Sequence, residues 1–301
     1  MTVTSAIGPI GIWTAQLDTQ PSRLAQAAVR DLETLGYGAV WFPESFGREA
    51  FTNAGLLLAG SRRIVAATGI ASLYARDAVA MANGQRTLCE AYPERFLLGI
   101  GVSHAPAVEQ MRGHRYDSPV AAMRAYLDAM DRAPFRAVAP RTAPERVLAA
   151  LGPRMLALSA ERSGGAHTYF VPPEHTARAR EILGPGRLLA VEQAVVLERD
   201  AAKAREIART HTSGYLKLIN YTSNLRRLGF DEADLAGGGS DRLVDAIVGW
   251  GALDAVVGRV RAHQAAGADH VCIQVLTADR QVLPTAAWRE LAGALLPASA
   301  A

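Results

Sequence analysis

Two side chains that can transfer protons directly follow short apolar runs of the sequence. Glu44 comes after the run AVWF at 39–42, and His104 ends the stretch GIGVSH at 99–104. Histidine titrates near neutral pH, and a carboxylate beside a ligand can act as a general acid or base. The glycines before His104 also let a ligand approach the backbone closely. The alternatives are a polar filler at His104 and a surface carboxylate or helix cap at Glu44.

A candidate anion site lies in the sequence LGPRM at 151–155. Gly152 and Pro153 are typical of a helix start, which places Arg154 in the first turn. The free N–H groups of a helix N-terminus favour an anion, and a phosphate is the common guest. Gly152, Pro153, Arg154 and Met155 are therefore candidate cofactor-binding residues. The alternative is an ordinary loop with a surface arginine.

Other residues stand where a flat ligand and its substrate could bind. Trp13 ends the first apolar run and is either a wall for a flat ligand or a core residue. Gly69, between Thr68 and Ile70, indicates a bulge or a close backbone approach at the end of another run. A later segment supplies stacking and hydrogen-bonding groups, interpreted either as substrate contacts or as buried core: Tyr215, Asn220, Tyr221 and Asn224.

The sequence carries no motif of a metal site or of an activated nucleophile. There is no CxxC, HxH, HExxH, GxSxG or Walker A pattern, and no GxGxxG follows the first apolar run. We therefore expect no bound metal. Glycine-rich run ends, apolar walls, one anion site and one acid–base candidate together suit a phosphorylated cofactor that supplies the chemistry itself.

The elements that position these residues follow a repeated pattern, in which a helix ends at a glycine and a short apolar run begins. Gly36, Gly164 and Gly267 each precede such a run. A left-handed glycine cap followed by a buried strand is typical of parallel β/α proteins. Eight strands are predicted, near 7–13, 39–42, 64–70, 96–101, 147–151, 167–171, 188–197 and 270–276.

Eight parallel strands with helices between them predict a TIM (β/α)8 barrel, and an open doubly wound sheet is the alternative. Active sites of such barrels lie at the carboxyl ends of the strands, where Glu44 and His104 fall. His167 opens the sixth predicted strand, so we expect it at the opposite face. The chain is predicted to be a single domain over 1–301, with insertions at about 102–146 and 211–251 that cover the site or make oligomer contacts.

The composition narrows the classes of partner. Half of the 301 residues are hydrophobic and the net charge is only +3. All but two of the 32 basic residues are arginines interspersed with acids, so no nucleic-acid surface is expected. No apolar run is long enough to span a membrane, and no signal peptide is visible. With two distant cysteines in apolar surroundings, Cys89 and Cys272, these features predict a cytoplasmic protein that acts on a small molecule.

Five stretches of the chain are similar to one known family: GYGAVWFPE at 36–44, ATGI at 67–70, YPERFLLGIG at 92–101, GPRM at 152–155 and GADHV at 267–271. Over nearly its whole length the chain resembles the luciferase-like monooxygenase superfamily, and within it the branch that uses the deazaflavin coenzyme F420. The stretch at 92–101 is the most specific, because a Pro-x-Arg turn there leads into a strand that ends in Gly-x-Gly.

The resemblance implies an oxidoreductase with the barrel fold, a homodimer, and a cofactor that lies over the carboxyl ends of the strands. It implies a non-proline cis peptide that supports the deazaflavin ring, at Gly69–Ile70 or one residue along. The helix that begins at 152–153 would receive the cofactor phosphate. The residues that it implies around the cofactor are Trp13, Glu44, Thr68, Gly69, Ile70, Gly101, Ser103, Gly152, Pro153, Arg154 and Met155.

The proton-transfer residues differ from those of one group in this branch. The sugar-phosphate dehydrogenases carry Asp-His after strand two and a glutamate acid after strand four. This chain has Glu44-Ser45 and His104 at the matching positions, so sugar-phosphate oxidation is not expected. His104 is expected to donate or accept the proton, with Glu44 near the deazaflavin ring. The expected substrate contacts are Trp13, Tyr215, Tyr221 and Asn224.

The leading hypothesis is an F420-dependent oxidoreductase that transfers a hydride between the deazaflavin and a small or medium-sized organic substrate. One alternative keeps the fold but uses FMN with molecular oxygen, as a monooxygenase. The other is a non-catalytic relative that binds a flavin or deazaflavin without turnover.

Overall fold

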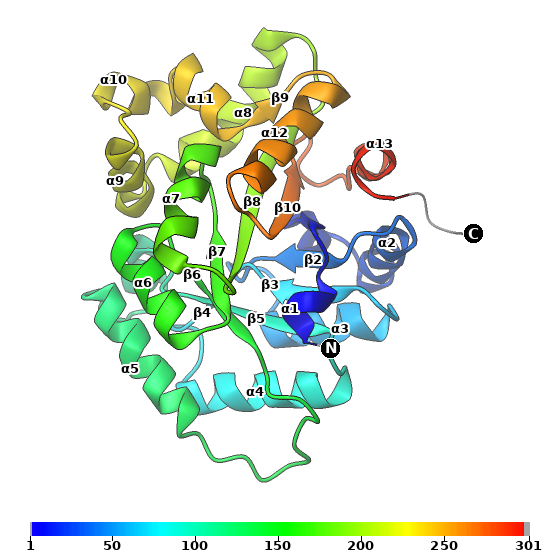
Figure 1. Ribbon diagram of the computed structural model, residues 1–301, viewed down its shortest axis with the longest axis vertical. Coiled ribbons are helices and arrows are strands. Elements are labelled where there is room, and N and C mark those ends of the chain that lie inside the picture. The colour runs from blue at the N-terminus through cyan, green and yellow to red at the C-terminus, as the bar shows by residue number, and fades with distance from the viewer. Residues whose placement is uncertain (1, 298–301) are drawn as a thin grey trace.

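Eight parallel strands close a barrel in the computed structural model, which describes residues 2–297 (Figure 1). Residue 1 and residues 298–301 of the predicted domain lie outside the described residues. The strand order is β10-β1-β2-β3-β5-β6-β7-β8, and β10 closes the circle by pairing with β8. The TIM barrel prediction is confirmed, and each strand overlaps a predicted range. The barrel strands are β1 (Ile10–Trp13), β2 (Ala39–Phe42), β3 (Val65–Thr68), β5 (Phe96–Gly101), β6 (Arg146–Ala149), β7 (Gly165–Thr168), β8 (Leu188–Val196) and β10 (His270–Val275).

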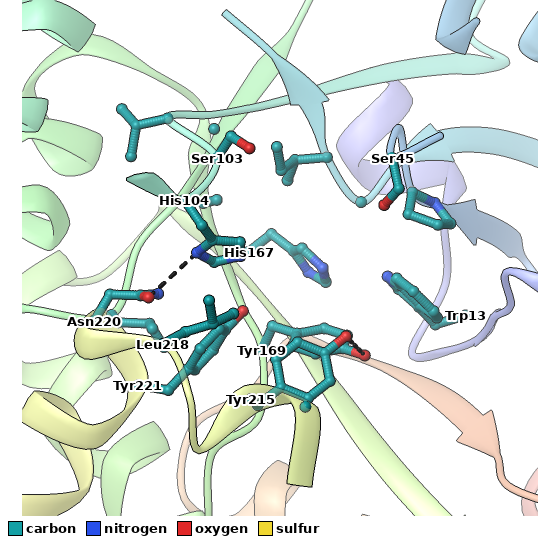
Figure 2. Close-up of a pocket in the computed structure, with 18 of the residues that line it drawn as sticks. Trp13, Ser45, Ser103, His104, His167, Tyr169, Tyr215, Leu218, Asn220 and Tyr221 are labelled. Carbon is teal, nitrogen blue, oxygen red and sulfur yellow. Dashed lines mark hydrogen bonds between the residues drawn. The ribbon is translucent and has the colours of Figure 1, made fainter. Parts of the chain in front are cut away.

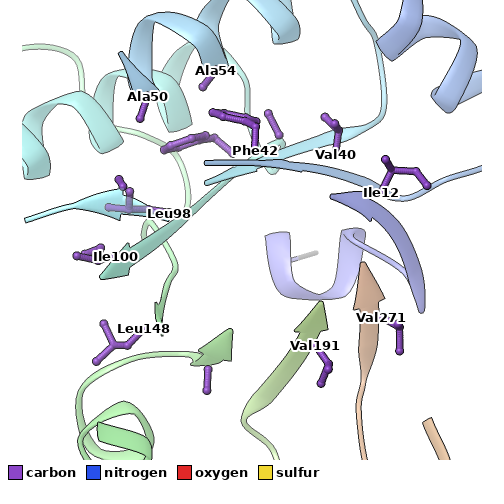
Figure 3. Close-up of a cluster of buried hydrophobic side chains, with 14 of the residues drawn as sticks. Ile12, Val40, Phe42, Ala50, Ala54, Leu98, Ile100, Leu148, Val191 and Val271 are labelled. Carbon is purple, nitrogen blue, oxygen red and sulfur yellow. The ribbon is translucent and has the colours of Figure 1, made fainter. Parts of the chain in front are cut away.

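The barrel strands read as continuous apolar runs because both of their faces are buried. Alternate residues point outward and inward along each strand. Val40 and Leu98 belong to the outer layer, which packs against helices (Figure 3). Their neighbours Trp41 and Leu97 belong to the cluster that fills the barrel. A slip of one residue would exchange the two layers, so the pattern fixes the register.

Helices cover the outside of the barrel (Figure 1). No helix within residues 2–297 combines the length and the apolar character needed to cross a membrane. The helices around the barrel are α2 (Ser22–Thr34), α3 (Ala50–Ala59), α4 (Ala78–Ala91), α5 (Pro119–Asp131), α6 (Pro153–Arg162), α7 (Pro173–Leu183), α12 (Leu253–Ala265) and α13 (Thr285–Leu295), with the short helices η1 (Gln16–Thr19) and η2 (Ala107–Met111). The short helix α1 (Val3–Ala6) instead lies at the amino ends of the strands, where Val3 joins the cluster that fills the barrel.

The glycines before the strands do two different jobs. Gly36 and Gly267 have φ values of 93° and 101°, the left-handed conformation expected of helix caps. Gly165 is extended and is the first residue of β7. A Cβ added there would lie 2.0 Å from the carbonyl oxygen of Leu188, so close strand approach demands this glycine. As a result β7 runs from Gly165 to Thr168, earlier than the predicted 167–171.

The predicted insertions hold additional short elements. Residues 102–146 contain η2 and α5. Outside the insertions, the short strand β4 (Ala71–Ser72) pairs with the end of β5. Between β8 and α12 lie α8 (Ala201–Tyr215), α9 (Ile219–Arg227), α10 (Glu232–Leu235), η3 (Ala236–Gly238), α11 (Asp241–Ile247) and β9 (Gly249–Trp250). Tyr221 and Leu225 of α9 pack with Phe170 and Val196 in one apolar cluster. This contact seats α9 on the carboxyl ends of β7 and β8.

Candidate functional site

A cavity of about 1140 Å³ opens at the carboxyl ends of the barrel strands (Figure 2). Its walls come from the strand ends and the segments that follow them, and from α8 and α9. The structure brings most of the predicted site residues together there: Trp13, Glu44, Gly69, Ile70, Gly101, Ser103, His104, Gly152, Pro153, Arg154, Met155, Tyr215 and Tyr221.

Two predicted site residues do not line the cavity. Thr68, expected to contact the cofactor, is buried, and its hydroxyl donates to the carbonyl oxygen of Gly99 and accepts from the Gly99 N–H, both at 2.8 Å. It therefore joins β3 to β5. Asn224, expected to contact the substrate, is buried behind the wall, and its Oδ1 accepts a hydrogen bond of 3.3 Å from Nη2 of Arg227. Asn224 thus positions an arginine that does line the cavity.

The Gly69–Ile70 peptide bond, which is cis, forms part of the cavity floor. The bond lies at the first of the two positions that the family resemblance implied. A Cβ added at Gly101 would lie 2.5 Å from Cδ1 of Ile70. The glycine therefore leaves room for the Ile70 side chain, and the floor is apolar, as the face of a flat ring requires.

Two buried nitrogen atoms beside this floor have no hydrogen-bond partner in the described part of the chain, Nε1 of Trp13 and Nε2 of His167. A Cβ added at Gly69 would lie 2.5 Å from the first and 3.3 Å from the second, so both nitrogens lie close to the Gly69 backbone, where a side chain would clash with the indole. Burial lowers the pKa of His167 to about 3, and its Nδ1 lies 3.3 Å from the carbonyl oxygen of Ala190. The neutral ring donates through Nδ1, which leaves Nε2 as an acceptor next to the indole donor.

The position of His167 corrects the sequence prediction. Because β7 begins at Gly165, His167 lies towards the carboxyl end of the strand and lines the cavity. Its ring stacks on Trp41, with centroids 4.6 Å apart. The double glycine at 164–165 was the available signal, since an extended glycine can open a strand as well as cap a helix.

His104 is held at the cavity wall by Asn220, the second residue of α9. Nδ1 of His104 lies 3.2 Å from Oδ1 of Asn220, and its ring centroid lies 5.5 Å from that of Tyr221 (Figure 2). Burial lowers the pKa of His104 below its usual value, and the bond to Asn220 opposes that shift. The imidazole is therefore neutral at pH 7 and can exchange a proton with a ligand.

Glu44 lines the cavity, but protein groups occupy its carboxylate. Oε1 accepts hydrogen bonds from the Ala50 N–H and the Arg76 guanidinium, and Oε2 accepts one of 2.9 Å from the Ser72 N–H. Arg76 also pairs with Glu49 at 2.7 Å. These bonds join the segment after β2 to β4 and to the start of α3. The geometry favours a positioning role for Glu44 over proton transfer.

The start of α6 opens into the cavity beside two arginines. Gly152 is the N-cap residue, and no side chain caps the first N–H groups. A Cβ added at Gly152 would have one neighbour within 4 Å, Nη2 of Arg227 at 3.5 Å, and Arg154 lines the same cavity. A helix N-terminus with two guanidinium groups suits a phosphate. Sequence reasoning missed Arg227, although it stands three residues after the predicted Asn224.

An aromatic wall connects three of the predicted residues. The Tyr215 hydroxyl donates to that of Tyr169 at 2.8 Å, which donates to Oε1 of Gln274 at 2.8 Å. The Tyr169 ring lies 5.1 Å from that of Trp13, and the Tyr215 ring lies 5.0 Å from that of Tyr221. Tyr169 was missed because it fell inside the predicted sixth strand.

The side chains of the cavity suit an organic cofactor. Within residues 2–297, no group of three or more His, Cys, Asp and Glu side chains is placed to hold a metal ion. The cavity offers an apolar floor, an aromatic wall and an open cationic end. The flat polar ring and the phosphate of the expected deazaflavin or flavin fit each of these features.

Comparisons with known proteins identify relatives of the barrel. The family model described as luciferase-like monooxygenase matches residues 8–270. A curated relative from Mycobacterium tuberculosis, named "Putative coenzyme F420-dependent oxidoreductase", is 28% identical over 207 residues. The match covers 59% of this chain and 58% of that protein, so the chain spans somewhat more than half the length of this relative.

Solved structures share the fold at low sequence identity. An F420-dependent secondary alcohol dehydrogenase in complex with an F420–acetone adduct has a TM-score of 0.73 at 14% identity, covering 92% of this chain and 98% of that chain. The oxygenating constituent of 3,6-diketocamphane monooxygenase from Pseudomonas putida, in complex with FMN, has a TM-score of 0.73 at 14% identity, covering 95% and 96%. The F420-dependent tetrahydromethanopterin reductase from Methanopyrus kandleri has a TM-score of 0.71 at 16% identity, covering 96% and 98%.

Proposed function

Because the chain belongs to the luciferase-like monooxygenase family, we propose that it is an oxidoreductase that uses coenzyme F420 to transfer a hydride to or from a small or medium-sized organic substrate. One observation carries the proposal: a single cavity contains both the apolar floor at Gly69–Ile70 and the cationic space at the start of α6. The curated relative that is named as F420-dependent supports the choice of a deazaflavin.

The residues around this cavity divide between the two ends of such a cofactor. Ile70 would support one face of the ring, and the Trp13 ring would form part of the wall beside it. The start of α6, with Arg154 and Arg227, would hold the phosphate. The deazaflavin, when bound, supplies a ring carbon that accepts or donates a hydride.

Hydride transfer to or from a carbon–oxygen bond also requires a proton to move. His104 is neutral, lies on the cavity wall, and has no hydrogen bond to Nε2 from any residue that the structure describes. Glu44 has its oxygens bonded to three protein groups. His104 is therefore the proton carrier in this proposal, and Glu44 holds the loop that faces it.

A monooxygenase that uses FMN and molecular oxygen is the second candidate. It is favoured by the FMN complex among the structural neighbours, whose TM-score of 0.73 equals that of the F420-dependent dehydrogenase. FMN and F420 share a three-ring system and a phosphate, so the same floor and cationic end suit both.

The deciding experiment is a titration of the purified protein with F420 and with FMN, in which quenching of the cofactor fluorescence measures binding. We expect F420 to bind tightly and reversibly and to exchange a hydride with a substrate without oxygen. Preferential binding of FMN with oxygen-dependent turnover would favour the monooxygenase. Bound F420 without hydride exchange with any compound tested would leave a non-catalytic binding protein, and no binding of either cofactor would refute both enzyme candidates.

Two glycine variants make this test specific for the proposed site. At Gly152 an aspartate fits without a clash, and its carboxylate would pair with Arg227 and repel the phosphate. We expect Gly152→Asp to weaken F420 binding by about tenfold or more, a loss of about 1.4 kcal/mol. Gly258→Asp adds the same charge to the exposed face of α12, where nothing lies within 4 Å, and should leave the affinity unchanged.

A further inference from the structure

The contact between His104 and Asn220 determines which nitrogen of the imidazole faces a ligand. The amide oxygen of Asn220 lies 3.2 Å from Nδ1 of His104. An amide oxygen can only accept a hydrogen bond, so Nδ1 must carry the proton. The other nitrogen of a neutral ring then holds a lone pair. Because His104 lines the cavity, this lone pair is available to a substrate (Figure 2).

The neutral form of His104 is favoured by its surroundings. Burial is the larger influence on its pKa and lowers it, while the uncharged Asn220 amide opposes this only in part. The ring also lies against Tyr221, whose pKa burial raises well above its usual value. The Asn220 contact and the lowered pKa both favour a neutral ring with an unprotonated Nε2, which is suited to accept a proton.

Glu192 on β8, whose pKa burial raises to about 8, interacts electrostatically with Tyr221 and changes charge near neutral pH. The other titratable and charged groups around the cavity that are named here keep one charge state. Burial lowers the pKa of His167 to about 3 and raises those of Tyr116 and Tyr215 to about 12. The guanidinium groups of the cavity are permanently charged. The groups in question are Tyr116 before α5, Arg154 on α6, His167 on β7, Tyr215 on α8, and Tyr221 and Arg227 on α9.

We propose that Asn220 is a positioning residue that holds His104 in the Nδ1-protonated form, so that Nε2 acts as a base towards the hydroxyl group of an alcohol substrate. This proposal rests on the proposed function and names its substrate class.

The step balances with the groups named. The hydroxyl proton of the alcohol passes to Nε2 of His104, and the electron pair of the O–H bond forms the second bond of a carbonyl. The carbinol C–H bond breaks, and its hydrogen leaves with both electrons as a hydride to the oxidised deazaflavin. The imidazolium then returns its proton to water. The reverse reaction starts with His104 protonated on Nε2.

The first test uses the protein without cofactor and measures His104 by ¹⁵N NMR over a pH titration, with His104→Gln to assign its signals. The wild type should show the Nδ1-protonated tautomer. Asn220→Asp places a carboxylate on the same nitrogen and should raise the His104 pKa by about 1–3 units. An acidic residue in the first turn of α9 is also favourable for the helix, so the variant should fold. An Nε2-protonated wild type, or no change of pKa in the variant, would overturn the proposal.

Ser223→Asp is the matched control, because Ser223 lines the same cavity one turn further along α9. It adds the same charge without a bond to His104, and should shift the pKa by less than half as much. Asn220→Ala should abolish the tautomer preference. A shift in Ser223→Asp as large as in Asn220→Asp would assign the effect to the charge of the cavity and reject the bond.

The second test follows alcohol oxidation by the holoenzyme as a function of pH. The base must be unprotonated, so activity falls as pH drops through the His104 pKa, and Asn220→Asp should move this acidic limb upward by the shift seen in NMR. A limb that stays in place would refute the base assignment, as would bound F420 with no alcohol oxidised. A protein that does not bind F420 would refute the proposed function, while the NMR result would still decide the contact between Asn220 and His104.

Discussion

Two neighbouring arginines at the end of α9 should differ sharply in their effect on cofactor binding. Arg227 faces the open space at Gly152 and is held by Asn224. Arg226 instead forms a two-point ion pair with Glu232, at 2.7 and 3.1 Å. Arg227→Gln therefore removes a guanidinium from the proposed phosphate site, and Arg226→Gln removes the same charge one residue away.

The size of the effect follows from the bond that Arg227 can make. A hydrogen bond to a charged group contributes about 1.5–3 kcal/mol. Arg227 is exposed, and solvent screening reduces this to about 1–2 kcal/mol. The Kd for F420 should therefore rise by about 5–30-fold in Arg227→Gln. In Arg226→Gln the Kd should stay within about twofold of the wild type, because its guanidinium is already paired away from the cavity.

The assay is a fluorescence titration with F420 and, in parallel, with the ribityl deazaflavin that lacks the phosphate and everything attached beyond it. The affinity loss in Arg227→Gln should be confined to the ligand that carries the phosphate, and should shrink as salt is added. Equal losses for the two ligands, or for the two arginine variants, would refute the assignment of Arg227 to the phosphate.

Three further predictions concern the proton carrier His104, the ion pair between Glu44 and Arg76, and the buried histidines. His104→Gln should lower kcat by about 10²–10⁴-fold with an unchanged Kd for F420, and an unchanged kcat would remove His104 from the reaction. Glu44→Ala leaves the largely buried Arg76 guanidinium paired only with Glu49, and should lower the free energy of unfolding by about 3 kcal/mol in denaturant titrations. An unchanged free energy of unfolding would mean that the segment after β2 is held without this ion pair. Burial lowers the pKa of four histidines to about 3 or 4. Below about pH 6.5 the unfolded chain therefore binds protons at these histidines, and the folded chain does not. The free energy of unfolding should then fall by about 1.4 kcal/mol per histidine at pH 5.5. Glu192, whose pKa is raised to about 8, offsets part of this loss because its contribution has the opposite sign. Equal stability at pH 7 and pH 5.5 would contradict the prediction. The four are His167, His211, His263 and His270.

The barrel could be predicted from the sequence because its strands have a clear local signal. They are apolar on both faces, and left-handed glycines at 36 and 267 separate two of them from the preceding helices. The helix start at Gly152 could be predicted for the same kind of reason, since Gly-Pro is a local signal of a helix N-terminus. Positions at the ends of strands follow from the barrel geometry, and this brought Trp13, Gly69 and His104 to one cavity.

The residues that sequence reasoning missed depend on long-range packing. His167 was predicted at the amino end of its strand and lies towards the carboxyl end. The reason is that Gly165, which resembles a helix cap in the sequence, begins the strand and packs against Leu188. Arg227 and Gln274 reach the cavity only through the fold of α9 and the closure of β10 onto β8. The role of Glu44 could not be predicted either, because its partners Ser72 and Arg76 come from a segment beyond the next strand.

The insertion helix α9 connects the two ends of the proposed chemistry. Asn220, at its beginning, holds the ring of His104, and Arg227, at its end, faces the phosphate site. Seven residues separate them, which is about 10 Å along a helix. Tyr221 and Leu225 anchor the same helix to the barrel core. Since one rigid element carries both groups, a cofactor that binds its phosphate at Arg227 also sets its ring relative to His104, so phosphate binding contributes to catalysis by orientation as well as to affinity.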